Sequence, residues 1–194
     1  MDDMQLGWTY DNLRLTAPTV ELDLGCGAGS FARALAHRYP DRLILAGDVM
    51  IGRLRKVNKN REAPNLRVLR VESRYLVSVL LADASLDRIH LLCPDPWPKG
   101  KHKGHRLLAS NFIAQLHRVL KTDGVFHFST DDAPYWEQAQ QVLSASGLFA
   151  AAPEALADIA DLQTDFERHW LAGGKTVRHA AWRKLPLPPH TIGH

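Results

Sequence analysis

The 194-residue sequence has only two cysteines, Cys26 and Cys93, and no CxxC pair. This excludes a zinc ribbon and a disulfide framework, so we expect two free thiols and a cytoplasmic protein. No stretch approaches the roughly 18 unbroken apolar residues that a membrane span needs. The first residues are acidic and then mixed, without the basic start and apolar run of a secretory signal. We therefore expect neither a membrane span nor a signal peptide.

The composition is that of a globular protein. Apolar residues make up 45% and charged residues 23%, which excludes disorder for the bulk of the chain. The length fits one domain, which we place at residues 1–185, followed by a Pro-rich tail at 186–194. We expect a monomer or a weak homodimer.

The net charge of +3 is small, but it is unevenly distributed. The window from Pro96 to Thr122 contains no Asp or Glu, and its basic residues are Lys99, Lys101, Lys103, Arg106, Arg118 and Lys121. Such an asymmetry is typical of a face that binds a polyanion. A second basic stretch, residues 53–61, is better explained as a solvated helix face.

Short apolar runs alternate with segments of helical periodicity. We expect strands at 20–24, 42–47, 66–71, 86–93, 124–129 and 177–183. Helices are expected at 30–39, 50–60, 107–120 and 135–146, with a helix or turn at 75–81. This order predicts an α/β fold with a mostly parallel sheet, in which ligands bind beyond the carboxyl ends of the strands.

A glycine loop follows the first expected strand. Gly25, Gly27 and Gly29 let a ligand approach the backbone, and Asp48 at the end of the second strand can accept hydrogen bonds from a ribose. A nicotinamide dinucleotide fingerprint needs a sixth-position glycine, where this chain has a serine. Asp23 adds a negative charge that repels a pyrophosphate and suits a ligand with an ammonium and a sulfonium. The loop therefore favours S-adenosylmethionine over NAD.

A stiff segment with three prolines, P-D-P-W-P-K, follows the fourth expected strand. Its prolines fix Asp95, Trp97 and Lys99 relative to the sheet. Trp97 offers a surface for an extruded base, or it packs on the sheet edge. Because the acid-free basic run begins at Lys99, a polyanion would be held at the mouth of the cofactor site.

Four motifs of this chain resemble the bacterial tRNA (guanine-N7-)-methyltransferase family. They are V-E-L-D-L-G-C-G-A-G, L-L-C-P-D-P-W-P-K-G-K-H-K-G-H-R-L, F-H-F-S-T-D-D and T-D-F-E-R. The similarity runs in order from about Val20 to Lys184. It implies a Rossmann-like class I methyltransferase with a seven-stranded sheet, S-adenosylmethionine as cofactor, and methylation of guanine 46 in the variable loop of tRNA.

The resemblance also implies residue roles. Asp95 is the catalytic residue and counts among the cofactor residues together with Asp23, Asp48 and Glu72. The implied substrate residues are Lys99, Asp131, Thr164, Asp165, Phe166 and Glu167. The implied RNA-binding residues are Lys101, His102, Lys103 and Arg106. No metal is expected, because the His102 and His105 pair lacks a third ligand.

The chain departs from the family pattern at several positions. Asp23 and Asp48 stand where the family usually has Glu, and Gly100 and Gly104 stand where it usually has Lys or Arg. The 19 residues before the first strand lack a basic arm. Three alternatives stay open: a methyltransferase with a small-molecule or protein acceptor, a non-catalytic tRNA-binding relative and, most distant, a nicotinamide dehydrogenase.

Overall fold

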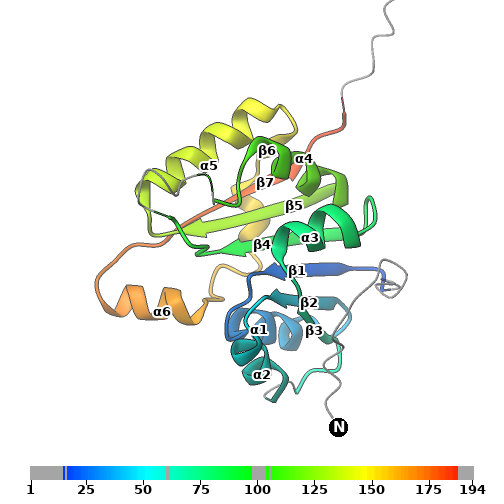
Figure 1. The fold of residues 1–194 in the computed structure, drawn as a ribbon, viewed down its shortest axis with the longest axis vertical. Coiled ribbons are helices and arrows are strands. Elements are labelled where there is room, and N and C mark those ends of the chain that lie inside the picture. Colours follow the sequence, from blue (N-terminus) through cyan, green and yellow to red (C-terminus); the bar gives the residue numbers. More distant parts are fainter. Residues whose placement is uncertain (1–14, 16, 60–61, 98–103, 105, 188–194) are drawn as a thin grey trace, which may run out of the picture.

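The computed structural model describes residue 15 and residues 17–59, 62–97, 104 and 106–187. A seven-stranded sheet with the order β3-β2-β1-β4-β5-β7-β6 forms the centre of this part (Figure 1). Its strands are β1 (Val20–Leu24), β2 (Leu43–Asp48), β3 (Leu66–Arg70), β4 (Leu86–Leu92), β5 (Leu120–Thr130), β6 (Phe149–Ala151) and β7 (Arg178–Lys184). Strand β7 runs antiparallel to β5 and β6, and the other neighbouring strands are parallel.

Helices follow most of the parallel strands. They are α1 (Ser30–Arg38), α2 (Ile51–Lys59), α3 (Ser73–Tyr75) with a π-helical turn (Leu76–Leu80), α4 (Ser110–Val119), α5 (Ala133–Ser146), a 3₁₀ turn (Pro153–Leu156) and α6 (Asp165–Ala172). Local signals fix their ends. The Asp132 carboxylate accepts the Tyr135 N–H to cap α5, and Gly147 ends that helix at φ 64°.

The two faces of the sheet carry different side chains. Alternate residues of β1, Val20, Leu22 and Leu24, pack with the π-helical turn, α4 and α5 in the larger apolar cluster. Helices α1 and α2 cover the other face with a smaller apolar cluster. Because successive strand residues point to opposite faces, Glu21 and Asp23 lie on the side of α1 and α2. Charged residues in a strand buried on both faces are exceptional and indicate a specific role.

The predicted α/β fold class is confirmed, and the expected strands are present. Strand β5 begins at Leu120 rather than Gly124, and α4 begins at Ser110 because its N-cap, Ala109, is extended. The 148–163 stretch had no predicted structure and contains β6 and the 3₁₀ turn, while α6 was not predicted. Of the proposed 186–194 tail, residues 188–194 lie outside the described residues.

Candidate functional site

The expected site residues gather at the carboxyl edge of the sheet. The glycine loop follows β1, Asp48 ends β2, Glu72 follows β3, the segment from Cys93 follows β4, and Asp131 follows β5. In Figure 1 the arrowheads of β4 and β5 and helix α6 lie on the same side of the molecule. Open parallel sheets bind ligands at this edge.

The glycine loop is anchored to β2 and leaves open space beside two of its glycines. The N–H groups of Gly25 and Cys26 donate to the Gly47 carbonyl oxygen at 2.8 and 2.9 Å. The Gly27 N–H donates to Asp48 Oδ2 at 3.0 Å. A Cβ on Gly25 or Gly27 would meet nothing within 4 Å, whereas one on Gly29 would lie 2.7 Å from Val57 Cγ2. The open side of the loop can therefore admit a ligand close to the backbone.

Two carboxylates face this loop. Asp23 is 3% exposed and Asp48 is 6% exposed. Burial raises the pKa of Asp23 to about 7, and the charge of Asp48 adds to this effect. An ammonium group on a ligand would relieve the repulsion and favour the ionised form. The buried acid pair and the open glycine loop fit the charged methionine end of S-adenosylmethionine.

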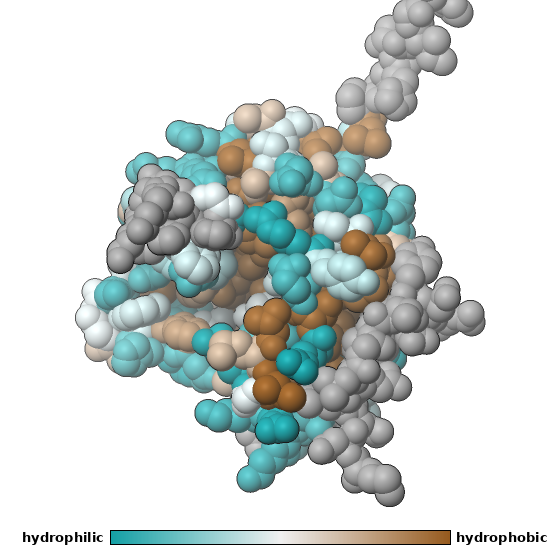
Figure 2. Space-filling model, viewed as in Figure 1, coloured by the Kyte–Doolittle hydropathy of each residue, from teal (hydrophilic) through white to brown (hydrophobic). Residues whose placement is uncertain are grey.

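The next strand end adds another carboxylate and apolar surface. Glu72 caps α3 by accepting the N–H groups of Arg74 and Tyr75 at 2.9 and 2.8 Å. Val49 and Met50, directly after Asp48, are 53% and 52% exposed. Figure 2 shows apolar surface around the middle of this face and mostly hydrophilic surface along its upper and left margins. Exposed apolar side chains beside Asp48, which the sequence reasoning missed, suit a flat base.

The segment after β4 has a strained backbone. Cys93 and Trp97 adopt positive φ angles of 46° and 43°, which non-glycine residues rarely do. The Asp95 carboxylate stabilises the turn, because its Oδ1 accepts the Trp97 N–H at 3.0 Å. Asp95 itself is exposed. Strain of this kind persists where the surroundings hold it, and it gathers at functional sites.

Arg106 is buried and supports this segment, whereas we predicted that it would bind RNA at the surface. It is 3% exposed, and its Nε donates to the Pro96 carbonyl oxygen at 2.7 Å. Its Nη1 donates to Gln138 Oε1 at 2.6 Å. Because this guanidinium is enclosed by the protein, the expected contact with RNA phosphate is wrong for the structure as it stands. The other expected RNA-binding residues, Lys101, His102 and Lys103, and the expected substrate residue Lys99 lie outside the described residues.

The late T-D-F-E motif forms the start of α6. Thr164 caps this helix through its Oγ1, which accepts the Glu167 N–H at 3.0 Å. Asp165 pairs with Arg168, and Phe166 is 48% exposed. Glu167 is buried, with Oε1 2.8 Å from His179 Nε2 and with no hydrogen-bond partner for Oε2 among the described residues.

Asp131 and Glu167 lie near the segment that follows β4. Burial raises the pKa of the Cys93 thiol, and the charges of Glu167 and Asp131 raise it further. The Asp131 carboxylate lies 3.7 Å from Lys175 Nζ. The structure thus brings two of the expected substrate carboxylates to the strand end that carries Asp95.

A row of three histidines leads away from Glu167, and the sequence reasoning missed it. His179, next to Glu167, is partly exposed, and the other two are buried. His90 and His127 are 0% and 3% exposed and follow each other across β4 and β5. A signal was present, because Glu21, His90 and His127 each stand between two apolar neighbours in their strands.

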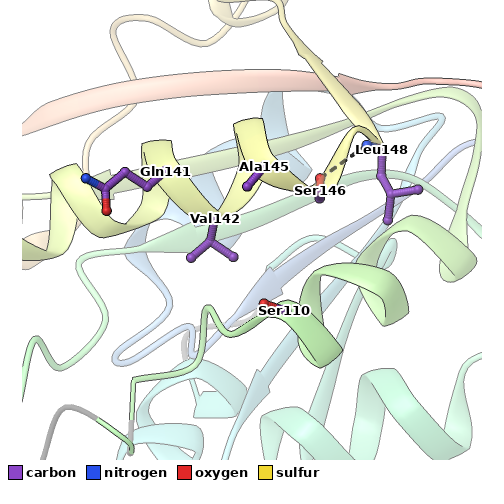
Figure 3. Close-up of a pocket in the computed structure, with 6 residues that line it drawn as sticks. All are labelled: Ser110, Gln141, Val142, Ala145, Ser146 and Leu148. Atoms are coloured by element: carbon purple, nitrogen blue, oxygen red, sulfur yellow. Dashed lines mark hydrogen bonds between the residues drawn. The ribbon is translucent and has the colours of Figure 1, made fainter.

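A separate hollow of about 400 Å³ lies between α4 and α5 (Figure 3). Its lining residues are Ser110, Gln141, Val142, Ala145, Ser146 and Leu148. No expected site residue is among them.

In the described part of the chain, none of the helices is both long and apolar enough to cross a membrane. Nor does any group of three or more His, Cys, Asp or Glu side chains there suit a metal ion.

Known proteins share this fold at low sequence identity. A 16S rRNA methyltransferase, KamB, superimposes with a TM-score of 0.64 at 18% identity, covering 91% of this chain and 93% of that one. A 16S rRNA (adenine(1408)-N(1))-methyltransferase from Catenulisporales acidiphilia, solved with S-adenosylmethionine, gives a TM-score of 0.58 at 17% identity, covering 93% and 92%. These similarities confirm the class I methyltransferase fold.

Sequence similarity is more specific. Residues 17–180 match the family described as a putative methyltransferase. A tRNA (guanine-N(7)-)-methyltransferase of Neisseria meningitidis serogroup A is 37% identical over 83% of this chain and 68% of its own length. One from Syntrophotalea carbinolica is 34% identical over 85% of this chain and 74% of its own. The chain therefore belongs to the tRNA (guanine-N7-)-methyltransferase family.

Proposed function

We propose that this protein transfers the methyl group of S-adenosylmethionine to N7 of a guanine in tRNA. The relatives named above support this acceptor, and the comparisons do not favour the small-molecule or protein alternative. One observation carries the proposal in the structure. Strands β1 and β4 are neighbours, with Asp23 beside His90 in register, so the glycine loop and the Asp95 turn leave the sheet side by side.

The chemistry needs alignment rather than a strong base. When bound, S-adenosylmethionine supplies an activated methyl group on a sulfonium. Guanine N7 carries a free lone pair, so no proton has to be removed before it attacks. The protein must hold N7 in line with the methyl group and stabilise the positive charge that develops on the purine. We assign this stabilisation to Asp95, whose carboxylate the turn after β4 fixes.

We expect guanine to be selected by carboxylate oxygens that accept hydrogen bonds from its Watson–Crick edge. This edge presents N–H donors at N1 and N2, whereas adenine presents an acceptor at N1. Among the described residues, Oε2 of Glu167 is a buried acceptor without a partner, and Glu167 and Asp131 both lie near Cys93, two residues before Asp95. A buried acceptor without a partner costs about 1–3 kcal/mol, which a guanine N–H would recover.

The backbone of the tRNA would be held by the basic run that begins at Lys99. Each phosphate that a lysine neutralises adds about 0.9 to the slope of log affinity against log salt concentration. Guanine 46 as the target, the cytoplasm as the location and a monomer or weak homodimer as the assembly stay predictions.

Methyl transfer from labelled S-adenosylmethionine to unmodified bulk tRNA tests the proposal. Chemical cleavage at 7-methylguanine then locates the product. We expect label in tRNA and a single cleavage in the variable loop. Cofactor binding without label in tRNA would contradict the proposal and point to the binding-only relative. A single cleavage elsewhere would keep the reaction and overturn only the position.

A further inference from the structure

A continuous row of hydrogen-bonded side chains crosses the sheet beneath α1 and ends at Glu167. Glu21 Oε2 lies 3.0 Å from His90 Nε2, and His90 Nδ1 lies 3.0 Å from His127 Nδ1. His127 Nε2 lies 3.0 Å from His179 Nδ1, and His179 Nε2 lies 2.8 Å from Glu167 Oε1. We call these five residues the histidine row. Its members come from β1, β4, β5, β7 and α6, and Phe31 of α1 packs edge-on against His90.

Counting protons constrains the state of this row. Each of its four contacts needs one hydrogen, and a neutral imidazole carries a single N–H. Three neutral histidines supply three hydrogens, and two ionised carboxylates supply none. A row in which all four contacts are hydrogen bonds therefore holds four protons, one more than three neutral histidines and two ionised carboxylates provide.

The Glu21 end determines where this proton lies. Burial raises the pKa of Glu21, but the hydrogen bond from His90, the charge of Arg88 and the hydrogen bond from Arg42 outweigh it and lower the pKa to about 2. Glu21 is therefore ionised, and His90 must donate through Nε2. Burial lowers the pKa of His90 despite its bond to Glu21, so His90 is neutral and its Nδ1 is an acceptor.

The remaining bonds then follow in one direction. Burial lowers the pKa of His127 well below its ordinary value, so this ring is also neutral. Its Nδ1–H donates to His90, and its Nε2 accepts from Nδ1–H of His179. The extra proton is left between His179 Nε2 and Glu167 Oε1, at the end of the row that borders the site.

We propose that His179 is a positioning residue that carries this proton as an imidazolium and holds Glu167 ionised, with Oε2 directed to the Watson–Crick edge of the substrate guanine. The proposal rests on the proposed function and deepens it. Two observations support it independently of the proton count. Thr164 and Glu167 have the spacing of a capping box, in which the glutamate would reach back to the N-cap N–H, yet Glu167 instead contacts His179. Its side chain is only 8% exposed, and Oε2 has no partner in the described part of the chain.

Other charged or titratable groups lie around the row and determine which of its ends is negative and which is positive. They are Arg42, Arg88 and Asp158 around Glu21, Asp23 beside His90, and Asp131, Cys93 and Lys175 near Glu167. The arginines hold the negative charge of Glu21 at one end. The carboxylates near Glu167 favour a positive charge at the other end.

NMR of the wild-type protein with ¹⁵N-labelled histidine tests the proton positions directly. We expect His90 with a proton only on Nε2, His127 with a proton only on Nδ1, and His179 protonated on both nitrogens. A singly protonated His179 together with a protonated Glu167 carboxyl group would overturn the proposal. Because this measurement needs no methyl transfer, its outcome is separate from that of the proposed function.

Replacing His127 with phenylalanine tests the consequence for substrate. His127→Phe removes the acceptor for His179 Nδ1–H, so the doubly protonated ring that holds Glu167 is less favoured at higher pH. We expect KM for tRNA to rise roughly tenfold at pH 8, the effect of losing one charge-assisted hydrogen bond, with kcat nearly unchanged. At pH 6 the KM values of variant and wild type should converge.

His169→Gln is the matched control, because His169 lies on α6 but outside the histidine row. It should keep the wild-type KM at both pH values. An unchanged KM and pH profile in folded His127→Phe would contradict the positioning role of His179. If that variant does not fold, the tautomers of the wild-type protein still decide the proposal.

Discussion

The Arg106 guanidinium donates to the Pro96 carbonyl oxygen at 2.7 Å and fixes the turn that carries Asp95. Its Nη2 also lies 3.4 Å from Oδ1 of Asp132, the N-cap of α5, and its Cζ lies 4.7 Å from the centre of the Tyr135 ring. One buried side chain thus ties the loop after β4 to the start of α5. Removing it leaves several partly buried acceptors without this donor.

Arg106→Ala should lower the free energy of unfolding by roughly 3 kcal/mol, because a buried charge network loses its cation. Denaturant unfolding measures this loss. The slope of log tRNA affinity against log salt should stay unchanged, since Arg106 does not contact phosphate in this arrangement. A slope reduced by about 0.9 with normal stability would restore Arg106 to the RNA-binding residues.

Arg55→Ala is the control for this measurement. Arg55 lies on α2 and is exposed. Exposed substitutions away from special features change stability by about 0.5 kcal/mol or less.

Arg106 also shows where sequence reasoning reaches its limit. The alternation of strands and helices follows from local hydrophobic periodicity, so the sheet and the carboxyl edge with Asp23 and Asp48 could be predicted. Whether an arginine in a basic run faces solvent depends on long-range partners such as Gln138, which periodicity does not reveal. The partners in the histidine row are likewise remote, since 69 residues separate Glu21 from His90. Helix α6 was missed because it is short and packs no apolar stripe into the core. Its one buried side chain is that of Glu167, whereas Phe166 and Leu171 are exposed.

The glycine loop offers a test that separates binding from folding. Gly29 has φ 75°, and a Cβ there would lie 2.7 Å from Val57 Cγ2, so Gly29→Ala must displace packed core atoms. We expect it to lower the free energy of unfolding by about 2–3 kcal/mol, from overpacking and the left-handed backbone. Thermal unfolding of the cofactor-free protein measures this.

Gly27→Ala is the counterpart at the open side of the loop. A Cβ there meets no protein atom within 4 Å, so the cost to folding is only the backbone strain, about 1–2 kcal/mol. Because this space is assigned to the cofactor, affinity for S-adenosylmethionine should fall at least tenfold by calorimetry. Equal cofactor affinity in Gly27→Ala and wild type would place the ligand elsewhere.

The raised pKa of Asp23 predicts opposite pH effects on folding and on binding. Burial and the Asp48 charge raise it from the ordinary value of 3.8 to about 7, so between these values the folded chain binds more protons than the unfolded chain. Stability of the cofactor-free protein should therefore fall as pH rises, by about 2 kcal/mol from pH 5.5 to 7 from this group. Asp23→Asn should remove that fall in denaturant unfolding.

Cofactor binding should show the reverse trend. The ammonium group of S-adenosylmethionine prefers ionised Asp23, so affinity should rise up to tenfold per unit as pH approaches 7 and level off above it. Calorimetric titrations at pH 5.5, 6.5, 7.5 and 8.5 measure this. A flat profile would show that Asp23 does not face the cofactor amine.

Asp95 can be tested for charge and for turn formation separately. Asp95→Asn keeps an oxygen that accepts the Trp97 N–H but removes the negative charge, whereas Asp95→Ala removes both. If the charge stabilises the developing cation on guanine, Asp95→Asn should lower kcat about a hundredfold or more, with KM for tRNA nearly unchanged. Stability should change by less than about 0.5 kcal/mol, because Asp95 is exposed.

Single-turnover methyl transfer measures the chemical step. Near-normal rates in Asp95→Asn with slow rates in Asp95→Ala would show that Asp95 only forms the turn. Another carboxylate would then have to stabilise the positive charge on the purine, and Asp131 would be the next residue to replace.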